Sequence, residues 1–184
     1  MIQPIYLYGS EVLRARAAEA DITKKEELSQ LVTDLKDTLA KADGCGLAAP
    51  QIGVSLRVVI VDGTVMTDVY DYLADFRRVM INPVILSESE QKCEYSEGCL
   101  SIPGIYADVV RPVSITVRYY NENFEEVTEV FYKFGCRMVQ HELSHLDGVV
   151  FTDLVAPIRK KMIAKKLLNI SRGKVSAHYN CKIK

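Results

Sequence analysis

The feature that most constrains this chain is the pentapeptide HELSH at residues 141–145. Two histidines four residues apart on a helix lie about 40° apart around its axis and one turn along it. The imidazoles of His141 and His145 can therefore bind one metal ion, and the carboxylate of Glu142 can act as a general base. Because two of the three histidines in the chain fall in this pattern, a metal site on a helix is favoured over a chance polar face.

The third ligand of such a site distinguishes the classes of HExxH enzyme. One class of protease has a histidine six residues after the second histidine, where this chain has Phe151. Another uses a downstream glutamate, but no glutamate follows Glu142 and no acidic residue follows Asp153. Only His178, in a basic tail, remains downstream. We therefore expect the third ligand upstream, and a cysteine thiolate suits a tetrahedral site that keeps one position open.

Four cysteines precede or adjoin this helix, and each could also be a small buried hydrophobic residue. Cys136 lies well around the helix from His141, and Cys93 lies in a strand-like run. Cys99 follows Gly98, which lets the backbone approach a ligand closely. Spacing alone thus gives Cys99 a modest lead over Cys45. A disulfide framework is not expected, because the chain has five cysteines and no export signal.

Hydrophobic periodicity predicts an α+β fold. Apolar spacing indicates a helix over 24–42, with a capping box from Thr23 to Glu26. Short β-branched runs predict strands at 57–61, 79–86, 113–120 and 127–132, the last two forming a hairpin. Residues 62–76 are interpreted as a loop insertion, and helices are expected over 134–146 and 158–170. Strands grouped between helices, without βαβ alternation, favour α+β over a parallel α/β sheet.

Length and composition predict one globular domain. The chain has 184 residues, of which 48% are hydrophobic and 26% are charged. No apolar run approaches the ~20 residues that cross a bilayer, and the N-terminus lacks the pattern of a signal or transit peptide. We therefore expect a cytoplasmic protein without membrane partners.

The charge is distributed unevenly along the chain. The net charge is −1, but residues 154–184 carry nine basic and no acidic residues. A basic tail on an acidic body indicates an anionic partner such as the ribosome, reached through Lys161, Lys165 and Arg172. A solvated helix face explains the same charges equally well.

Three motifs, in a fixed order, make the chain similar to the peptide deformylases over nearly its full length. They are GCGLAAPQ at 44–51, EGCLS at 97–101 and QHELSH at 140–145. The resemblance implies an α+β fold with a central HExxH helix surrounded by antiparallel or mixed sheets. It also implies a helix in the N-terminal half and one near the C-terminus. Residues 1–184 would form one catalytic domain, with a basic C-terminal helix and tail at about 158–184.

The same resemblance implies an activity and a set of site residues. The family removes the formyl group from the N-terminal formyl-methionine of new polypeptides and releases formate. Its metal is expected to be one Fe²⁺ per chain, with Zn²⁺ or Ni²⁺ as replacements. By resemblance, the metal ligands are Cys99, His141 and His145. The catalytic acid/base is Glu142, and the groups that bind the formyl oxygen are Gln51 and the N–H of Leu100. The substrate contacts are Gly44, Gly46, Glu97 and Gly98.

One position departs from the family pattern. The family usually has aspartate between the glutamate and the second histidine, where this chain has Ser144. The ligands and the base are unchanged, but a cation is expected to lose its charge partner. Arg118 and Arg137 are the candidates for that cation.

Two other functions remain as alternatives. The first is an HExxH metallopeptidase that cleaves internal bonds of unformylated peptides. The second is a metal-stabilised module that binds the ribosome without activity. Release of formate from a formyl-methionyl peptide distinguishes the three hypotheses.

Overall fold

A computed structural model describes residues 1–183, so Lys184, a member of the basic tail, lies outside the described residues. The α-helices are α1 (Lys25–Ala42), α2 (Lys133–Leu146) and α3 (Pro157–Ser171). The strands are β1 (Ile5–Tyr6), β2 (Gly46–Ala48), β3 (Val58–Asp62), β4 (Arg77–Glu88), β5 (Lys92–Cys99), β6 (Ile102–Pro112), β7 (Ser114–Tyr120), β8 (Glu126–Tyr132) and β9 (Cys181–Lys182). Short 3₁₀ segments are η1 (Glu11–Leu13), η2 (Ala49–Ile52), η3 (Gly63–Met66), η4 (Asp71–Leu73) and η5 (Phe151–Asp153).

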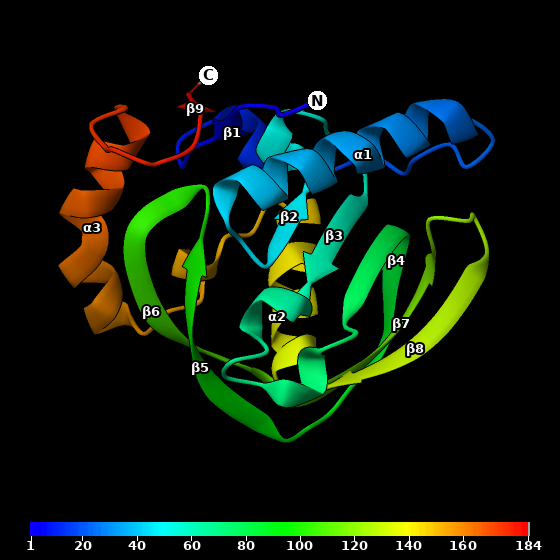
Figure 1. Ribbon diagram of the computed structural model, residues 1–184. Helices are drawn as coiled ribbons and strands as arrows, with labels where there is room; N and C mark the ends of the chain where they lie inside the picture. The colour runs from blue at the N-terminus through cyan, green and yellow to red at the C-terminus, as the bar shows by residue number, and fades with distance from the viewer. Residues whose placement is uncertain (184) are drawn as a thin grey trace.

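The strands form three groups around a central helix. An antiparallel sheet has the order β2-β3-β4-β7-β8, β5 pairs with β6 as a hairpin, and β1 pairs with β9 in parallel. Helix α2 runs through the middle of the molecule, with the five-stranded sheet on one side and the β5–β6 hairpin on the other (Figure 1). Helix α1 crosses the β2–β3 end of the sheet, and α3 packs on β6. The predicted α+β class is confirmed.

Strand β3 of the five-stranded sheet is buried on both faces, which explains its continuous apolar run. Alternate side chains of a strand point to opposite faces. Val58 and Ile60 pack with the apolar face of α1, whereas Val59 and Val61 pack with α2. The sheet therefore fixes the position of α2 between two layers.

Helix α1 has the predicted extent, but the predicted capping box is wrong. The residue at the N-cap is Lys24, which makes no side-chain capping bond. The hydroxyl of Thr23 instead donates to Oδ1 of Asp21 at 2.7 Å. The Thr23 N–H, which the Glu26 carboxylate would accept in a capping box, also donates to Oδ1 of Asp21, at 3.0 Å.

The predicted strands and the predicted β7–β8 hairpin are confirmed, with boundaries shifted by one or two residues. The β5–β6 hairpin was not predicted as a pair of strands. Residues 62–76 are more than an external loop, because Leu73 of this segment is buried and packs into the core around α2.

Helix α2 has one face that packs in the core and an opposite face that carries the two histidines. Val139, Leu143 and Leu146 pack against the five-stranded sheet. The spacing of 3.6 residues per turn then directs His141 and His145 to the opposite side. All five cysteines are free. Within residues 1–183, no helix is both long and apolar enough to cross a membrane.

Candidate metal centre

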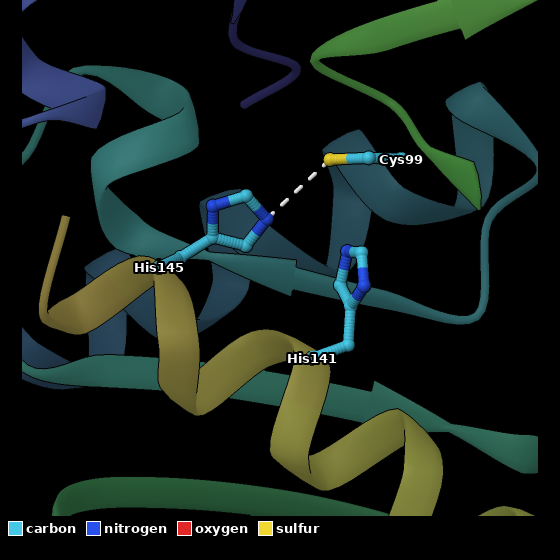
Figure 2. A group of neighbouring side chains, drawn as sticks. All are labelled: Cys99, His141 and His145. Carbon is cyan, nitrogen blue, oxygen red and sulfur yellow. Dashed lines mark hydrogen bonds between the residues drawn. The ribbon is translucent and has the colours of Figure 1, made fainter. Parts of the chain in front are cut away.

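Three side chains from two elements converge on one point. Cys99 ends β5, while His141 and His145 occupy successive turns of α2. Their ligand atoms all lie within 4.8 Å of one another, and Sγ of Cys99 lies 3.4 Å from Nε2 of His145. Figure 2 shows the thiol and both imidazoles pointing toward a shared space. The spacing of the HELSH motif thus places two ligands, and the end of β5 supplies the third.

The donor set fits a divalent metal ion. One sulfur and two imidazole nitrogens suit zinc and late first-row ions, and three ligands leave one position open in a tetrahedral site. Burial lowers the pKa of His145 well below its ordinary value, which keeps its imidazole in the neutral form that binds metals. Oε2 of Glu142 is buried and has no hydrogen-bond partner among the described residues. A carboxylate oxygen left unpaired beside the three ligands is expected where a bound group completes the site.

Glu97 lies behind His141 and accepts hydrogen bonds from two arginines. Arg111 donates to it at 2.8 and 3.0 Å, and Arg137 donates at 2.7 Å. Nδ1 of His141 lies 2.8 Å from Oε1 of the same carboxylate. With Nδ1–H as the donor, Nε2 faces the metal position, which is the usual way in which a carboxylate orients a histidine ligand.

The pKa shifts agree with this orientation. Burial alone would raise the pKa of Glu97, but hydrogen bonds from His141 and Arg111 outweigh burial and lower it. Burial lowers the pKa of His141, but contacts with Cys99 and Glu97 outweigh burial and raise it to about 10. A metal ion binds the neutral imidazole, so a metal at this site would displace the second proton of this ring from Nε2. Glu97 was also expected to contact the substrate. It lines the cavity, but both of its oxygens already take part in hydrogen bonds with Arg111, Arg137 and His141, so a substrate contact stays a prediction.

The cation that faces Ser144 is Arg111. Its Nη1 donates to Oγ of Ser144 at 2.9 Å. The candidates Arg118 and Arg137 were wrong, because Arg118 is exposed on β7 and Arg137 donates to Glu97 and to the Val109 carbonyl. No sequence signal identifies Arg111, since it is brought to α2 by the hairpin that periodicity missed.

Two potential donors lie beside the thiol of Cys99. Gln51 is buried in η2, where the Ala48 N–H donates to its Oε1 at 2.9 Å. This bond directs its Nε2 toward Oγ of Ser101 at 3.1 Å and Sγ of Cys99 at 3.5 Å. Leu100 begins the two-residue turn between β5 and β6. The structure therefore brings both predicted oxygen-binding groups to the metal ligands.

A cavity of about 650 Å³ opens onto these residues. Gly44, Gly46, Gly98 and Glu142 are among its lining residues. A Cβ atom at Gly46 would lie 2.5 Å from Oε1 of Glu142, so only glycine fits there without moving the carboxylate. Burial raises the pKa of Glu142 to about 7. A carboxylate with this pKa can both accept and release a proton near neutral pH.

Further residues that line the cavity lie outside the three sequence motifs. Val65 and Met66 belong to η3 within the 62–76 segment, and Phe134 lies in the first turn of α2, the helix that carries the histidines. His178 and Tyr179 reach the cavity from the C-terminal tail. No local pattern marks these positions, because each depends on packing between distant segments.

Comparisons with known proteins agree with this geometry. A sequence model described as Polypeptide deformylase matches residues 2–161. The chain is 39% identical to the peptide deformylase of Christiangramia forsetii, over 97% of this chain and 94% of the relative. It is 42% identical to that of Fusobacterium nucleatum, over 94% of each.

Solved structures give the same result. The peptide deformylase of Plasmodium falciparum has a TM-score of 0.82 and 30% identity, over 92% of this chain and 95% of the other. The peptide deformylase of Legionella pneumophila has a TM-score of 0.81 and 33% identity, over 95% of this chain and 98% of the other.

Proposed function

The chain belongs to the polypeptide deformylase family, and from this premise we propose how its own residues carry out the family's reaction. Members of this family are metal-dependent hydrolases that remove the formyl group from the N-terminal methionine of nascent peptides. The observation that carries the proposal is the convergence of one thiol, two imidazoles and the buried Glu142 carboxylate, whose Oε2 has no hydrogen-bond partner within residues 1–183, on one cavity.

The proposed metal ligands are Cys99, His141 and His145. The proposed ion is Fe²⁺, with Zn²⁺ or Ni²⁺ as replacements, because a mixed sulfur and nitrogen donor set accepts all three. When bound, such an ion lowers the pKa of water and polarises a carbonyl oxygen. Glu97 supports the site by holding the ring of His141 through its Nδ1.

Glu142 is proposed as the base and then the acid of the reaction. Its raised pKa and its unpaired Oε2 suit it to accept a proton from the attacking water. It would then pass this proton to the departing amine, giving formate and a free N-terminus. Gly46 keeps the space beside this carboxylate open.

Gln51 and Leu100 are proposed to stabilise the charge that develops on the formyl oxygen. The Gln51 amide is held by the Ala48 N–H, so the N–H that now faces Cys99 is already directed into the site. The backbone N–H of Leu100 is the second donor. Loss of one such donor typically lowers the rate by roughly 10²–10³.

The substrate is proposed to bind as an extended strand. Strand β2 has a strand partner on one side only within the described residues. A nascent peptide can add to such an edge through backbone hydrogen bonds, which allows many sequences after the first residue. Gly46 lies on this strand, and Gly44 and Gly98 line the adjoining cavity. These glycines are the proposed contacts of the substrate backbone.

The test is formate release from a formyl-methionyl peptide, measured without oxygen and with the metal content determined. The same peptide without the formyl group is the control. We expect formate only from the first peptide and no cleavage of internal bonds. Internal cleavage of both peptides would indicate a metallopeptidase, and absence of formate with metal bound would indicate a binding module.

Three variants assign the roles. Glu142→Ala is expected to keep the metal and lose nearly all turnover. Cys99→Ala is expected to lose both metal and formate production. Cys136→Ala is the matched control, because this buried cysteine lies outside the ligand cluster. If Cys99→Ala kept full metal content and full formate release, the assigned centre would be wrong.

A ribosomal partner is proposed for the basic face of α3. Lys161 and Lys165 are exposed and lie about 40° apart on the helix, while the buried face packs on β6. Charge reversal of both is expected to weaken co-sedimentation with ribosomes in a salt-dependent way. Lys41→Glu, at an exposed position of α1, is the control. Unchanged co-sedimentation of the double variant would contradict this partner.

We also propose that residues 1–184 act as one catalytic domain in the cytoplasm. The apolar cluster that joins α3 to β6 supports a single unit. The proposed substrates are nascent peptides that emerge from ribosomes, which supports a cytoplasmic location. Cell fractionation tests this location.

A further inference from the structure

The end of the chain returns to the cavity instead of extending away as a loose basic tail. We call residues 174–183 the C-terminal strap. Its strand β9 pairs in parallel with β1, through Cys181 with Ile5 and Lys182 with Tyr6. Figure 1 shows the two strands side by side near both termini. The strap is therefore anchored beyond the cavity by the start of the chain.

Between α3 and this anchor, the strap passes over the cavity. Ser176, Ala177, His178 and Tyr179 all line it. Nε2 of His178 lies 3.2 Å from the carbonyl oxygen of Ala42, at the end of α1. The strap therefore adjoins the same rim as the GCGLAAPQ motif, although more than 120 residues separate them in sequence.

Tyr179 joins the strap to a catalytic segment by a hydrogen bond. Its hydroxyl donates to the carbonyl oxygen of Leu100 at 2.7 Å. Both residues also pack against the apolar cluster of α1. This carbonyl belongs to the turn whose first N–H is proposed to bind the formyl oxygen.

The Leu100–Ser101 turn is held by three separate segments. The Tyr8 N–H donates to the Ser101 carbonyl at 2.8 Å, and Gln51 donates to the Ser101 hydroxyl at 3.1 Å. The Tyr179 hydroxyl is the third restraint, and it acts on the peptide plane next to the Leu100 N–H. Because Cys99 directly precedes this turn, the orientation of the thiolate depends on the same restraints.

We propose that Tyr179 is a positioning residue, which fixes the Leu100 turn and thereby the direction of the Leu100 N–H and the Cys99 thiolate. This inference rests on the proposed function. It predicts that the hydroxyl acts on the transition state more than on substrate binding. Its loss should therefore lower kcat and leave KM nearly unchanged.

The test is Tyr179→Phe in the full chain, with Tyr119→Phe as the matched control. The Tyr119 hydroxyl also donates one hydrogen bond of 2.7 Å, to Glu129 within the five-stranded sheet. Each variant keeps its ring and loses one bond of equal length. We expect kcat to fall about threefold to tenfold for Tyr179→Phe, with KM within about twofold. Tyr119→Phe should keep the wild-type kcat even where its melting temperature falls.

A second measurement does not depend on turnover. With Co²⁺ as the bound probe, the sulfur-to-cobalt absorption band reports the orientation of the Cys99 thiolate. We expect this band to shift and Co²⁺ to dissociate faster in Tyr179→Phe, and neither change in Tyr119→Phe. Thermal unfolding confirms that both variants are folded at the assay temperature.

Each outcome decides the proposal. Wild-type kcat, spectrum and Co²⁺ dissociation in Tyr179→Phe would overturn it while leaving the proposed function intact. A Tyr179→Phe variant that does not fold would give the hydroxyl a role in the fold only, and would equally overturn it. If the wild-type chain released no formate, the proposed function would fail, and the Co²⁺ measurements would still test the positioning of Cys99.

Discussion

Replacing Ser144 by aspartate should stabilise this chain. Arg111 and Arg137 are both buried, and Glu97 is the carboxylate that they share. Two guanidinium groups and one carboxylate leave a net positive charge in this cluster. Nη1 of Arg111 already donates to the Ser144 hydroxyl at 2.9 Å, so an aspartate there would place a carboxylate against the same donor.

The size of the gain can be worked out from this contact. The present bond already has one charged partner, and hydrogen bonds to charged groups contribute about 1.5–3 kcal/mol; an aspartate adds the second charge and should move the bond from the lower to the upper end of this range. Part of the gain is lost, because the Ser144 hydroxyl also donates to the Gln140 carbonyl at 2.8 Å and aspartate cannot. We expect a net stabilisation of about 1 kcal/mol, which raises Tm by about 2–4 °C in a chain of this length.

The measurement is thermal and urea unfolding of Ser144→Asp beside Ser144→Asn. Asparagine has nearly the shape of aspartate without its charge, so it separates the ion pair from packing. Stabilisation by aspartate alone supports the charge argument. An unchanged or lower Tm in Ser144→Asp, or an equal rise in both variants, would refute it.

Two further predictions concern other sites. In Gly46→Ala, the new Cβ would lie 2.5 Å from Oε1 of Glu142, so the carboxylate must move. A displacement of about 1 Å should lower kcat/KM for formate release roughly 10²-fold. A kcat/KM within about twofold of wild type would contradict this. Burial raises the pKa of Glu129, but hydrogen bonds from Arg78 and Tyr119 outweigh burial and lower it. Glu129 therefore stabilises the fold above its unfolded pKa, and this contribution is lost as pH falls through the folded pKa. Between about pH 7 and about pH 3.5, urea unfolding of Glu129→Gln should show a smaller loss of stability than wild type, and an equal loss would count against the pair.

Much of the fold could be predicted because its signals are local. The periodicity of residues 24–42 and the β-branched runs around residue 121 each report on a single element or hairpin. The β5–β6 hairpin was missed because its strands carry charged and polar residues between short apolar stretches. The capping box failed because Asp21, just upstream, accepts the Thr23 N–H that Glu26 would have accepted.

In the site, too, some residues could be predicted from local spacing and others could not. The HELSH motif fixes the relation of His141 to His145, since a helix sets the angle between residues four apart. Spacing alone could not choose between Cys45 and Cys99, and resemblance to a family made that choice. The arginine that faces Ser144 was assigned wrongly, because Arg111 comes from a hairpin 33 residues away.

The sequence by itself determined the two-histidine part of the centre and the helix that carries it, because a helical period acts over a few residues. Tertiary structure alone decided which groups surround that centre. Glu97 became a support for His141, and the C-terminal strap brought Tyr179 to Leu100. The two residues of the first contact are 44 positions apart in the sequence, and those of the second are 79 positions apart. Such contacts depend on how separate layers pack, which no local pattern encodes.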